Sequence, residues 1–577
     1  MRRLFAYVKP YRRLFAAAFL MTLLLSFLGP ARPYLIQYVL DVPLALGDAA
    51  GVRFWMAVVV ALTLAQALVH YWQISWSHRL GESVTDDLRR QVFNHTLGLR
   101  SRFFDRMPVG ALQTRVVSDV ETLNALFSEG LISIFGELLQ VFALLALMLY
   151  TDWRLTLVSL LPLPLLVLAT YVFKLKVNAA FQRVRKAVAE LNTFLQERLT
   201  GLSVVQIFDQ ERREYEKFKV INARHRDAHL DTVFYYSVFF PVVELIAALS
   251  TAALIAYGSG AVVEGRTTFG TLVAFIMYLT MLFRPIRILA DRFNTLQLGL
   301  VGAERIFNLL DTREFIADGE EEYFPVVSPK IEFRDVRFAY VEGGREVLKG
   351  VSFVVEAGTT TAVVGATGSG KSTLVNLLMR FYEFEQGQIL IDGRDIRRFK
   401  IECLRRATGW VMQDVFLFSG TILDNVRLFD STMDETRVRR AAELIGADAF
   451  IERLPGKYRF EVGERGINLS TGQRQLVAFM RVLVHDPRIL LLDEATANVD
   501  PESEAMIQRA IALALNGRTS IVVAHRLSTI QKADQILVMR GGEIVESGAH
   551  AQLLAMDGYY AKLYRLQYAT APLPSNE

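Results

Sequence analysis

A glycine-rich turn in the second half of the chain reads Gly365-Ala366-Thr367-Gly368-Ser369-Gly370-Lys371-Ser372-Thr373. Apolar runs flank it at 361–364 and 374–379, so the spacing G-x-x-x-x-G-K-[ST] falls between a predicted strand and a predicted helix, as in a P-loop. Such a turn points backbone N–H groups and a helix N-terminus at phosphate oxygens. We expect Lys371 to neutralise phosphate charge and the Ser372 hydroxyl to bind Mg²⁺. A flexible Gly/Ser turn is the alternative, and the strand and helix context disfavours it.

The bulk composition indicates a membrane protein with several domains. The chain has 577 residues, 52% of them hydrophobic, and a mean hydropathy of +0.28, which is too apolar for an ordinary soluble enzyme. The net charge of +4 gives no reason to expect a nucleic-acid partner. Cys403 is the only cysteine, which excludes an internal disulfide and a cysteine-clustered metal site. The N-terminus lacks the pattern of a removable signal peptide.

Apolar stretches long enough to cross a bilayer recur in the first half. Six spans are predicted, at residues 14–46, 52–75, 128–150, 154–175, 235–262 and 268–290. Between Phe54 and Leu97 no strong helix breaker intervenes, which predicts roughly 70 Å of helix. Because the bilayer core takes only about 30 Å, the rest of this helix must project into water.

The distribution of basic residues predicts the orientation. Lysine and arginine crowd residues 2–13 and the long polar stretches 79–115 and 174–226, whereas the loops 41–51, 151–154 and 264–270 are short and hold few cations. By the positive-inside rule, the N-terminus, the long stretches and the P-loop region are cytoplasmic. We therefore expect a multi-pass protein of the cell (inner or plasma) membrane.

Two breaks and two acidic residues stand out within this helical half. The breaks, at 103–110 and 206–212, place aromatics beside charges, which predicts hairpin tips that dock on another domain; solvated turns are the alternative. Glu137 and Glu244 lie inside predicted spans, where ionisable side chains are costly. Either residue could contact cationic cargo or form an interhelical hydrogen bond.

A polar, proline-marked linker at 311–330 predicts a domain boundary. The expected organisation is therefore an α-helical six-span transmembrane domain at 1–310 and an α/β P-loop nucleotide-binding domain at 331–567, with a disordered tail at 568–577. Strands are predicted at 331–340 and 347–355. A continuous apolar strand at 488–494 ends in Asp493 and Glu494, which we expect to hold Mg²⁺ through water and to act as general base, respectively.

A second helix N-terminus precedes that strand. Residues 468–475 read Asn-Leu-Ser-Thr-Gly-Gln-Arg-Gln and open a helical run at 476–484. The hydroxyl and the glycine at its start predict a second anion site. The chain thus has one P-loop and a second helix N-terminus that could bind phosphate. We expect these two sites to act on different nucleotides.

These motifs together resemble those of an ATP-binding cassette (ABC) exporter half-transporter, over essentially the whole chain. The resemblance implies that Tyr340 stacks on adenine, that residues 365–373 form the Walker A loop, and that Asp493 and Glu494 complete Walker B. It further implies a Q-loop at Gln413, which would serve catalysis and Mg²⁺ binding. The signature motif would be Ser470, Thr471, Gly472 and Gln473. Asp500 would be the D-loop acid and His525 the switch histidine. Residues 461–466 resemble the loop that contacts the partner's helical hairpin, and the two breaks would be coupling helices.

Two motifs depart from the family pattern. Thr471 replaces the first glycine of Leu-Ser-Gly-Gly-Gln, and the D-loop reads Ala-Asn-Val-Asp at 497–500. A β-branched residue at a glycine position restricts φ and brings a Cβ toward the phosphate. In this family each ATP lies between the P-loop of one subunit and the signature of the other, so Thr471 would weaken the partner's site. We therefore expect a heterodimer with one competent and one degenerate ATP site; a homodimer is the alternative.

The resemblance implies ATP-driven export of a hydrophobic or amphiphilic substrate (drug, lipid or peptide) by alternating access, with ATP and Mg²⁺ as cofactors. The fusion of spans and cassette in one chain favours export over import by analogy. An ATP-gated channel or regulatory receptor on the same architecture is the alternative. A soluble ATPase acting on DNA shares the cassette motifs, but the six predicted spans exclude it.

Overall fold

The computed structural model describes residues 2–322, 325, 327–493, 501–524 and 527–568. It divides the chain into two compact units, and each unit contains two segments of the sequence. The helical unit comprises Met1–Leu97 and Val109–Thr312, and the α/β unit comprises Gly98–Pro108 and Arg313–Glu577. The first predicted hairpin tip therefore groups with the α/β unit.

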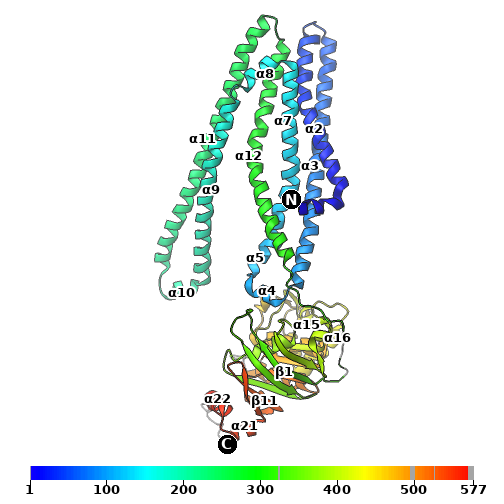
Figure 1. Ribbon diagram of the computed structural model, residues 1–577, viewed down its shortest axis with the longest axis vertical. Helices are drawn as coiled ribbons and strands as arrows, with labels where there is room; N and C mark the ends of the chain where they lie inside the picture. Colours follow the sequence, from blue (N-terminus) through cyan, green and yellow to red (C-terminus); the bar gives the residue numbers. More distant parts are fainter. Residues whose placement is uncertain (1, 323–324, 326, 494–500, 525–526, 569–577) are drawn as a thin grey trace. The chain divides into compact units, whose positions relative to one another are not determined.

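Long helices and shorter ones between them make up the helical unit (Figure 1). They are α1 (Arg2–Val8), α2 (Arg12–Val39), α3 (Ala49–Gly98), α5 (Val109–Thr114), α6 (Val120–Ala125), α7 (Ile132–Thr151), α8 (Trp153–Leu160), α9 (Leu163–Thr200), α10 (Leu202–Ile207), α11 (Glu211–Val263) and α12 (Phe269–Asp311). Short π-helical turns at Arg115–Asp119 and Leu126–Leu131 join α5, α6 and α7 into one continuous run.

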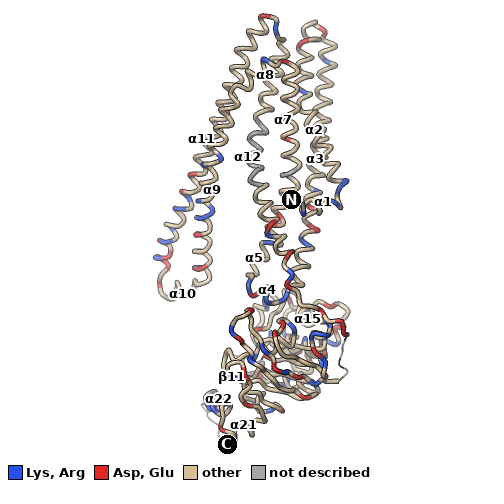
Figure 2. The backbone as a smooth tube through the Cα atoms, in the orientation of Figure 1, with Lys and Arg blue, Asp and Glu red and all other residues tan. Residues whose placement is uncertain are grey.

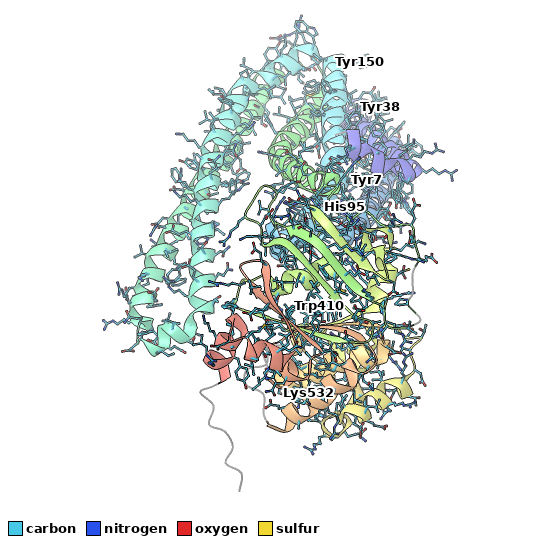
Figure 3. The ribbon with its side chains drawn as sticks, turned by 60° about the horizontal axis from the view of Figure 1, so that its bottom comes forward. Tyr7, Tyr38, His95, Tyr150, Trp410 and Lys532 are labelled. Atoms are coloured by element: carbon cyan, nitrogen blue, oxygen red, sulfur yellow. The ribbon has the colours of Figure 1, made fainter. Side chains whose placement is uncertain are left out.

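Five helical stretches of the described residues are long and apolar enough to cross a membrane: Arg3–Leu44, Ala49–Gly98, Val109–Thr151, Trp153–Thr200 and Glu211–Val263. They contain the first five predicted spans, apart from residues 45–46 of the first one. The sixth predicted span falls on α12, where the apolar stretch found among the described residues is the shorter Phe269–Phe283. Tyr150, labelled in Figure 3, is exposed where α7 ends, as is Trp153 at the start of α8. Aromatic residues at a helix end are typical of a membrane interface.

The prediction that the helices continue beyond their apolar spans is confirmed. Figure 2 shows charged residues gathered along α9 and α11 toward α10, whereas the opposite ends of these helices are almost free of charge. The two helices pack along their length: the rings of Phe173 and Phe239 stack at 3.9 Å, and Arg183 pairs with Asp231 at 2.8 Å further along. The predicted break at 206–212 corresponds to the turn between α10 and α11.

The α/β unit is built on two main sheets. Its strands are β1 (Ile331–Phe338), β2 (Leu348–Val355), β3 (Thr360–Gly365), β4 (Gln386–Ile391), β5 (Arg394–Asp395), β6 (Thr408–Val411), β7 (Gly420–Thr421), β8 (Glu461–Val462), β9 (Ile489–Asp493), β10 (Thr519–Val523), β11 (Gln535–Arg540) and β12 (Glu543–Gly548). The larger sheet has the order β12-β11-β3-β10-β9-β6, the smaller one β2-β1-β4-β5. The strands predicted at 331–340, 347–355 and 488–494 are confirmed, with ends shifted by one or two residues.

Helices surround these sheets. They are α4 (Ser101–Arg106), α13 (Lys371–Leu378), α14 (Ile401–Ala407), α15 (Ile422–Arg427), α16 (Glu435–Ile445), α17 (Asp448–Ile451), α18 (Thr471–His485), α19 (Pro501–Leu515), α20 (Leu527–Lys532), α21 (His550–Ala555) and α22 (Tyr559–Tyr568). Leu374 and Leu377 of α13 pack with Val363, Leu491 and Ile521 of the central strands in one hydrophobic core. The tail was predicted to be disordered over 568–577; Tyr568 is instead the last residue of α22, and 569–577 lie outside the described residues.

The order of the central strands decides where the motifs meet. β10 lies between β3 and β9 and is parallel to both, with Val523 opposite Val363 on one side and Asp493 on the other. All five residues of β10 and the first four of β9 are buried, as expected of interior parallel strands. The P-loop and Asp493 therefore lie at the same edge of the sheet, where α/β folds hold ligands.

Candidate functional site

The P-loop connects β3 to α13 through residues that require glycine. Gly368 and Gly370 have φ angles of +77° and +104°, in the left-handed region that side chains rarely adopt. A Cβ on Gly370 would lie 2.8 Å from Cδ2 of Leu348, and one on Gly365 would lie 2.3 Å from the carbonyl oxygen of Met539. Gly370 is therefore restricted to glycine by both conformation and space, Gly368 by its conformation, and Gly365 by the lack of space for a Cβ.

Two polar side chains of this loop are buried. Lys371 is 7% exposed, and its Nζ donates to the carbonyl oxygens of Gly365 and Ala366 at 2.8 and 3.0 Å. Burial lowers the pKa of Lys371, and the carboxylate of Asp493 partly opposes that shift. Ser369 is 3% exposed, and its Oγ has no hydrogen-bond partner among the described residues. A buried cation and a buried hydroxyl in a glycine turn fit a phosphate ligand.

The expected Mg²⁺ ligands are brought together only in part. The Ser372 Oγ donates to Oδ2 of Asp493 at 3.3 Å, so a hydroxyl and a carboxylate oxygen meet beside the P-loop, as Mg²⁺ requires. Gln413 follows β6 and is exposed. It lines a separate hollow of about 620 Å³ with Thr471, Arg474 and residues of 464–467. In the described part of the chain, Gln413 has no hydrogen bond to Ser372 or Asp493.

Tyr340, the predicted adenine-stacking residue, lies just beyond β1. Its hydroxyl is 3.1 Å from Oγ1 of Thr373 in the P-loop helix, and its ring meets the ring of Tyr382 edge-on at 5.1 Å. The Tyr382 hydroxyl in turn donates to Oδ2 of Asp105 in α4 at 2.8 Å. Burial, together with the Asp105 carboxylate, raises the pKa of Tyr382. A chain of contacts thus runs from the P-loop helix to the first hairpin tip.

The predicted signature motif begins α18. Ser470 and Gln473 form a capping box: the Ser470 Oγ accepts from the Gln473 N–H at 3.2 Å, and the Gln473 Oε1 accepts from the Ser470 N–H at 3.0 Å. Thr471 is the first helical residue, with the Arg474 guanidinium donating to its Oγ1 at 3.2 Å. Its φ is not positive. The backbone at Thr471 is therefore outside the left-handed region that favours glycine. Its side chain remains as the difference from glycine, and the expectation that the Cβ lies near a phosphate stays a prediction.

Three predicted site residues lie outside the described residues: Glu494, Asp500 and His525. The structure describes the strand before two of them, since β9 ends at Asp493 and β10 ends at Val523. In the helical unit, Glu137 lines a cavity between helices, whereas Glu244 is exposed on α11.

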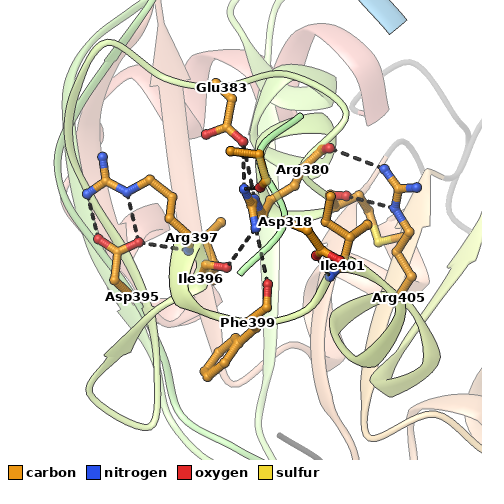
Figure 4. Close-up of polar contacts among 11 residues, drawn as sticks. Asp318, Arg380, Glu383, Asp395, Ile396, Arg397, Phe399, Ile401 and Arg405 are labelled. Carbon is orange, nitrogen blue, oxygen red and sulfur yellow. Dashed lines mark hydrogen bonds and ion pairs between the residues drawn. The ribbon is translucent and has the colours of Figure 1, made fainter. Parts of the chain in front are cut away.

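Sequence reasoning missed two residues that directly follow the P-loop helix, Arg380 and Tyr382. The Arg380 guanidinium is 2% exposed and donates to the carbonyl oxygens of Ala317, Ile396 and Phe399 and to Glu383 (Figure 4). Its φ of +51° is left-handed. The available signal was a charged residue directly after an apolar helix, which sequence alone does not distinguish from a solvated helix end.

The first hairpin tip belongs to the α/β unit through specific contacts. Arg100 donates through Nε to Glu314 at 3.2 Å, and its backbone N–H donates to the Glu314 carbonyl oxygen at 2.9 Å. Phe103 is buried, and Asp105 accepts from Tyr382. These contacts agree with the prediction that this break docks on a folded domain rather than forming a solvated turn.

Comparison with known proteins identifies the class. Residues 15–286 match the ABC transporter transmembrane region, and residues 348–497 match the ABC transporter domain. An uncharacterized ABC transporter ATP-binding protein of Bacillus subtilis (strain 168), YknV, is 37% identical over 99% of this chain and 95% of its own length. An ATP-dependent lipid A-core flippase of Syntrophus aciditrophicus (strain SB) is 34% identical, over 98% and 94%. The structure of a bacterial Atm1-family ABC exporter with ATP bound matches with a TM-score of 0.79 and 31% identity, covering 98% of this chain and 99% of that one.

The chain therefore belongs to the ABC transporter family, with the architecture of the ABC exporters. It is a multi-pass membrane protein whose ATP-binding domain couples ATP hydrolysis to export.

Proposed function

We propose that this chain is one half-transporter that exports a hydrophobic or amphiphilic substrate, drug, lipid or peptide, by alternating access. Residues 1–310 form six spans, 311–330 the linker and 331–567 the cassette. The observation that carries the proposal is the meeting of Ser372 and Asp493 at one sheet edge, 3.3 Å apart, beside the buried Lys371. The lipid A-core flippase relatives support an amphiphilic substrate.

Each predicted site residue receives a role in this proposal. The P-loop N–H groups and Lys371 hold the ATP phosphates, and Tyr340 stacks on adenine. Ser372 and Asp493 would hold Mg²⁺, with Gln413 as a further proposed ligand, and the ion would neutralise charge on the phosphates. Glu494 acts as general base toward the attacking water, and His525 contacts the terminal phosphate.

A second half-transporter is needed to complete the two ATP sites. Each ATP is held between the P-loop of one subunit and the signature of the other, so Ser470, Thr471, Gly472, Gln473 and Asp500 serve the partner's nucleotide. The side chain of Thr471 at a glycine position favours a non-identical partner, and hence a heterodimer. We expect the partner's hairpin tip to bind in the hollow that Gln413 and Glu464 line.

The proposed location is the cell (inner or plasma) membrane, with the N-terminus and the cassette in the cytoplasm. The charge distribution supports this orientation, since the charged parts of α9 and α11 lie toward α10 (Figure 2). The short loops at the opposite helix ends hold few cations.

A matched pair of variants tests the ATPase assignment. In proteoliposomes, Glu494→Gln is expected to keep ATP affinity and to lose at least about a hundredfold in hydrolysis, because the base is lost while the phosphate-binding groups remain. Lys371→Ala should instead weaken ATP binding, by roughly tenfold or more, through loss of a charge-assisted contact. Unchanged hydrolysis in the first variant contradicts the general-base role. Downhill ion flux without cargo-dependent ATPase would indicate a channel.

A further inference from the structure

A cavity of about 660 Å³ lies inside the helical unit, lined mainly by residues of α2, α3 and α7. Its lining is polar: one arginine, two histidines, three glutamines and several serines and threonines. The residues used below are Arg32, His70, Ser77, His78, Glu137 and Gln140. Polar side chains in a membrane-length apolar helix are costly and mark a functional site by default.

Two buried polar atoms of the lining residues have no hydrogen-bond partner in the described part of the chain. Ser77 is 1% exposed, and neither its Oγ nor the buried Nε of Arg32 has a hydrogen-bond partner among the described residues. Interhelical hydrogen bonding, the ordinary role of polar residues in spans, therefore does not explain these two atoms. Buried polar atoms without partners require another explanation, and a ligand supplies one.

Arg32 and Gln140 lie on facing surfaces of α2 and α7. Gly29, about one helical turn before Arg32, contacts Gln140: a Cβ added to Gly29 would lie 3.5 Å from the Gln140 Nε2. The guanidinium is always charged, and its planar fork matches the geometry of a carboxylate or phosphate. Glutamine amides add neutral N–H donors beside it.

Charge and lining together define the ligand. Among the described residues that line the cavity, Arg32 carries a permanent positive charge, His70 and His78 add imidazole groups, and Glu137 supplies a carboxyl group. Leu25, Ile74 and Met281 supply apolar surface in the same cavity. This combination fits a molecule with an anionic end and an apolar body better than it fits a cation or a purely apolar compound.

We propose that this cavity binds the anionic group, phosphate or carboxylate, of an amphiphilic substrate, and that Arg32 is the residue that selects its charge. The inference rests on the proposed export function and deepens it by naming the substrate class.

Equilibrium binding to the full-length chain in nanodiscs of zwitterionic lipid, without ATP, tests the inference. The probes are dodecyl phosphate, dodecyltrimethylammonium and inorganic phosphate. Arg32→Gln removes the charge and keeps hydrogen-bonding capacity, and Ser77→Ala removes the buried hydroxyl. Arg53→Gln is the matched control, because Arg53 is an exposed arginine of α3 that does not line the cavity. Thermal stability and gel filtration establish that each variant is folded.

We expect dodecyl phosphate to bind the wild-type chain at least about tenfold more tightly than the other two probes, and Arg32→Gln to lose roughly tenfold of that affinity, the size of one charge-assisted contact. Ser77→Ala should lose a smaller factor, and Arg53→Gln none. Equal binding of the two dodecyl probes, or unchanged affinity in Arg32→Gln, overturns the inference. Inorganic phosphate binding as tightly as dodecyl phosphate overturns its amphiphile part. Because binding is measured without ATP, loss of transport alone would contradict only the proposed function.

Discussion

At the residue scale, Arg380 links the helix after the P-loop to the segment that enters the α/β unit. Its Nη2 donates to the Ala317 carbonyl oxygen at 2.7 Å and to Glu383 at 2.9 Å. Its Nη1 donates to the carbonyl oxygens of Ile396 and Phe399, both at 3.3 Å. A buried charge surrounded by acceptors is costly to remove, because every acceptor then loses its partner.

Arg380→Met is therefore expected to destabilise the α/β unit by about 3 kcal/mol. Arg380→Lys should cost less, because the charge remains and only the planar fork is lost. Differential scanning calorimetry of the full chain measures both. Arg398→Met is the control: its side chain is 71% exposed and 4.0 Å from Glu321, so its loss should change stability by less than about 0.5 kcal/mol. Equal effects at positions 380 and 398 would contradict the assigned role.

At the element scale, α4 is a six-residue helix held on the α/β unit. Within this helix Phe103 is buried, and Asp105 accepts from the Tyr382 hydroxyl at 2.8 Å. Because Tyr382 also meets Tyr340, and Tyr340 reaches Thr373, α4 is two aromatic rings away from the P-loop helix. A change at the nucleotide is thus positioned to reach this hairpin tip.

Tyr382→Phe removes the hydroxyl that donates to Asp105 and keeps the ring that packs on Tyr340. One hydrogen bond to a charged group at a partly exposed site is worth about 1 kcal/mol, so amide hydrogens of α4 should exchange roughly fivefold faster. Hydrogen–deuterium exchange read by mass spectrometry measures this effect. Tyr215→Phe, an exposed tyrosine of α11, is the control. Unaltered exchange in α4 would show that the Asp105 contact does not hold the helix.

At the scale of the whole molecule, the signature motif decides whether a dimer of two identical chains would have fully active ATP sites. Thr471 opens α18 in ordinary helical geometry, capped by Ser470. Its φ is not positive, so the side chain alone distinguishes this signature from one with glycine. Thr471 is exposed at the helix start, so in the proposed composite site its side chain would take up space beside the partner's nucleotide.

The chain expressed and purified alone is expected to hydrolyse ATP slowly, because both composite sites of a homodimer would contain Thr471. Thr471→Gly should raise that rate roughly fivefold, equivalent to about 1 kcal/mol, whereas Thr471→Ala, which keeps a Cβ, should raise it less. Steady-state ATPase assays in proteoliposomes provide the measurement. Robust hydrolysis by a stable wild-type homodimer would contradict the heterodimer proposal.

The sequence by itself determined the class of the protein and the positions of its main elements. Apolar length fixed the first five membrane-length helices, because a bilayer imposes a minimum span. The P-loop was predicted from nine consecutive residues. Its glycines, of which Gly368 and Gly370 are left-handed, precede the Lys371-Ser372 pair at the spacing of the motif. The apolar strand that ends at Asp493 was also predictable from local sequence, because a strand buried on both faces is a continuous apolar run.

Only the tertiary structure decided which distant residues meet. The strand order places β10 between β3 and β9 and so brings Asp493 to Ser372, and no local pattern contains that order. Long-range contacts likewise decide that Arg380 is buried among carbonyl oxygens, that Tyr382 meets Asp105, and that Arg32 lines a cavity with His70 and Glu137. The physical reason is that burial and unmet hydrogen-bonding capacity are properties of packing, whereas length, periodicity and turn conformation are properties of the local chain.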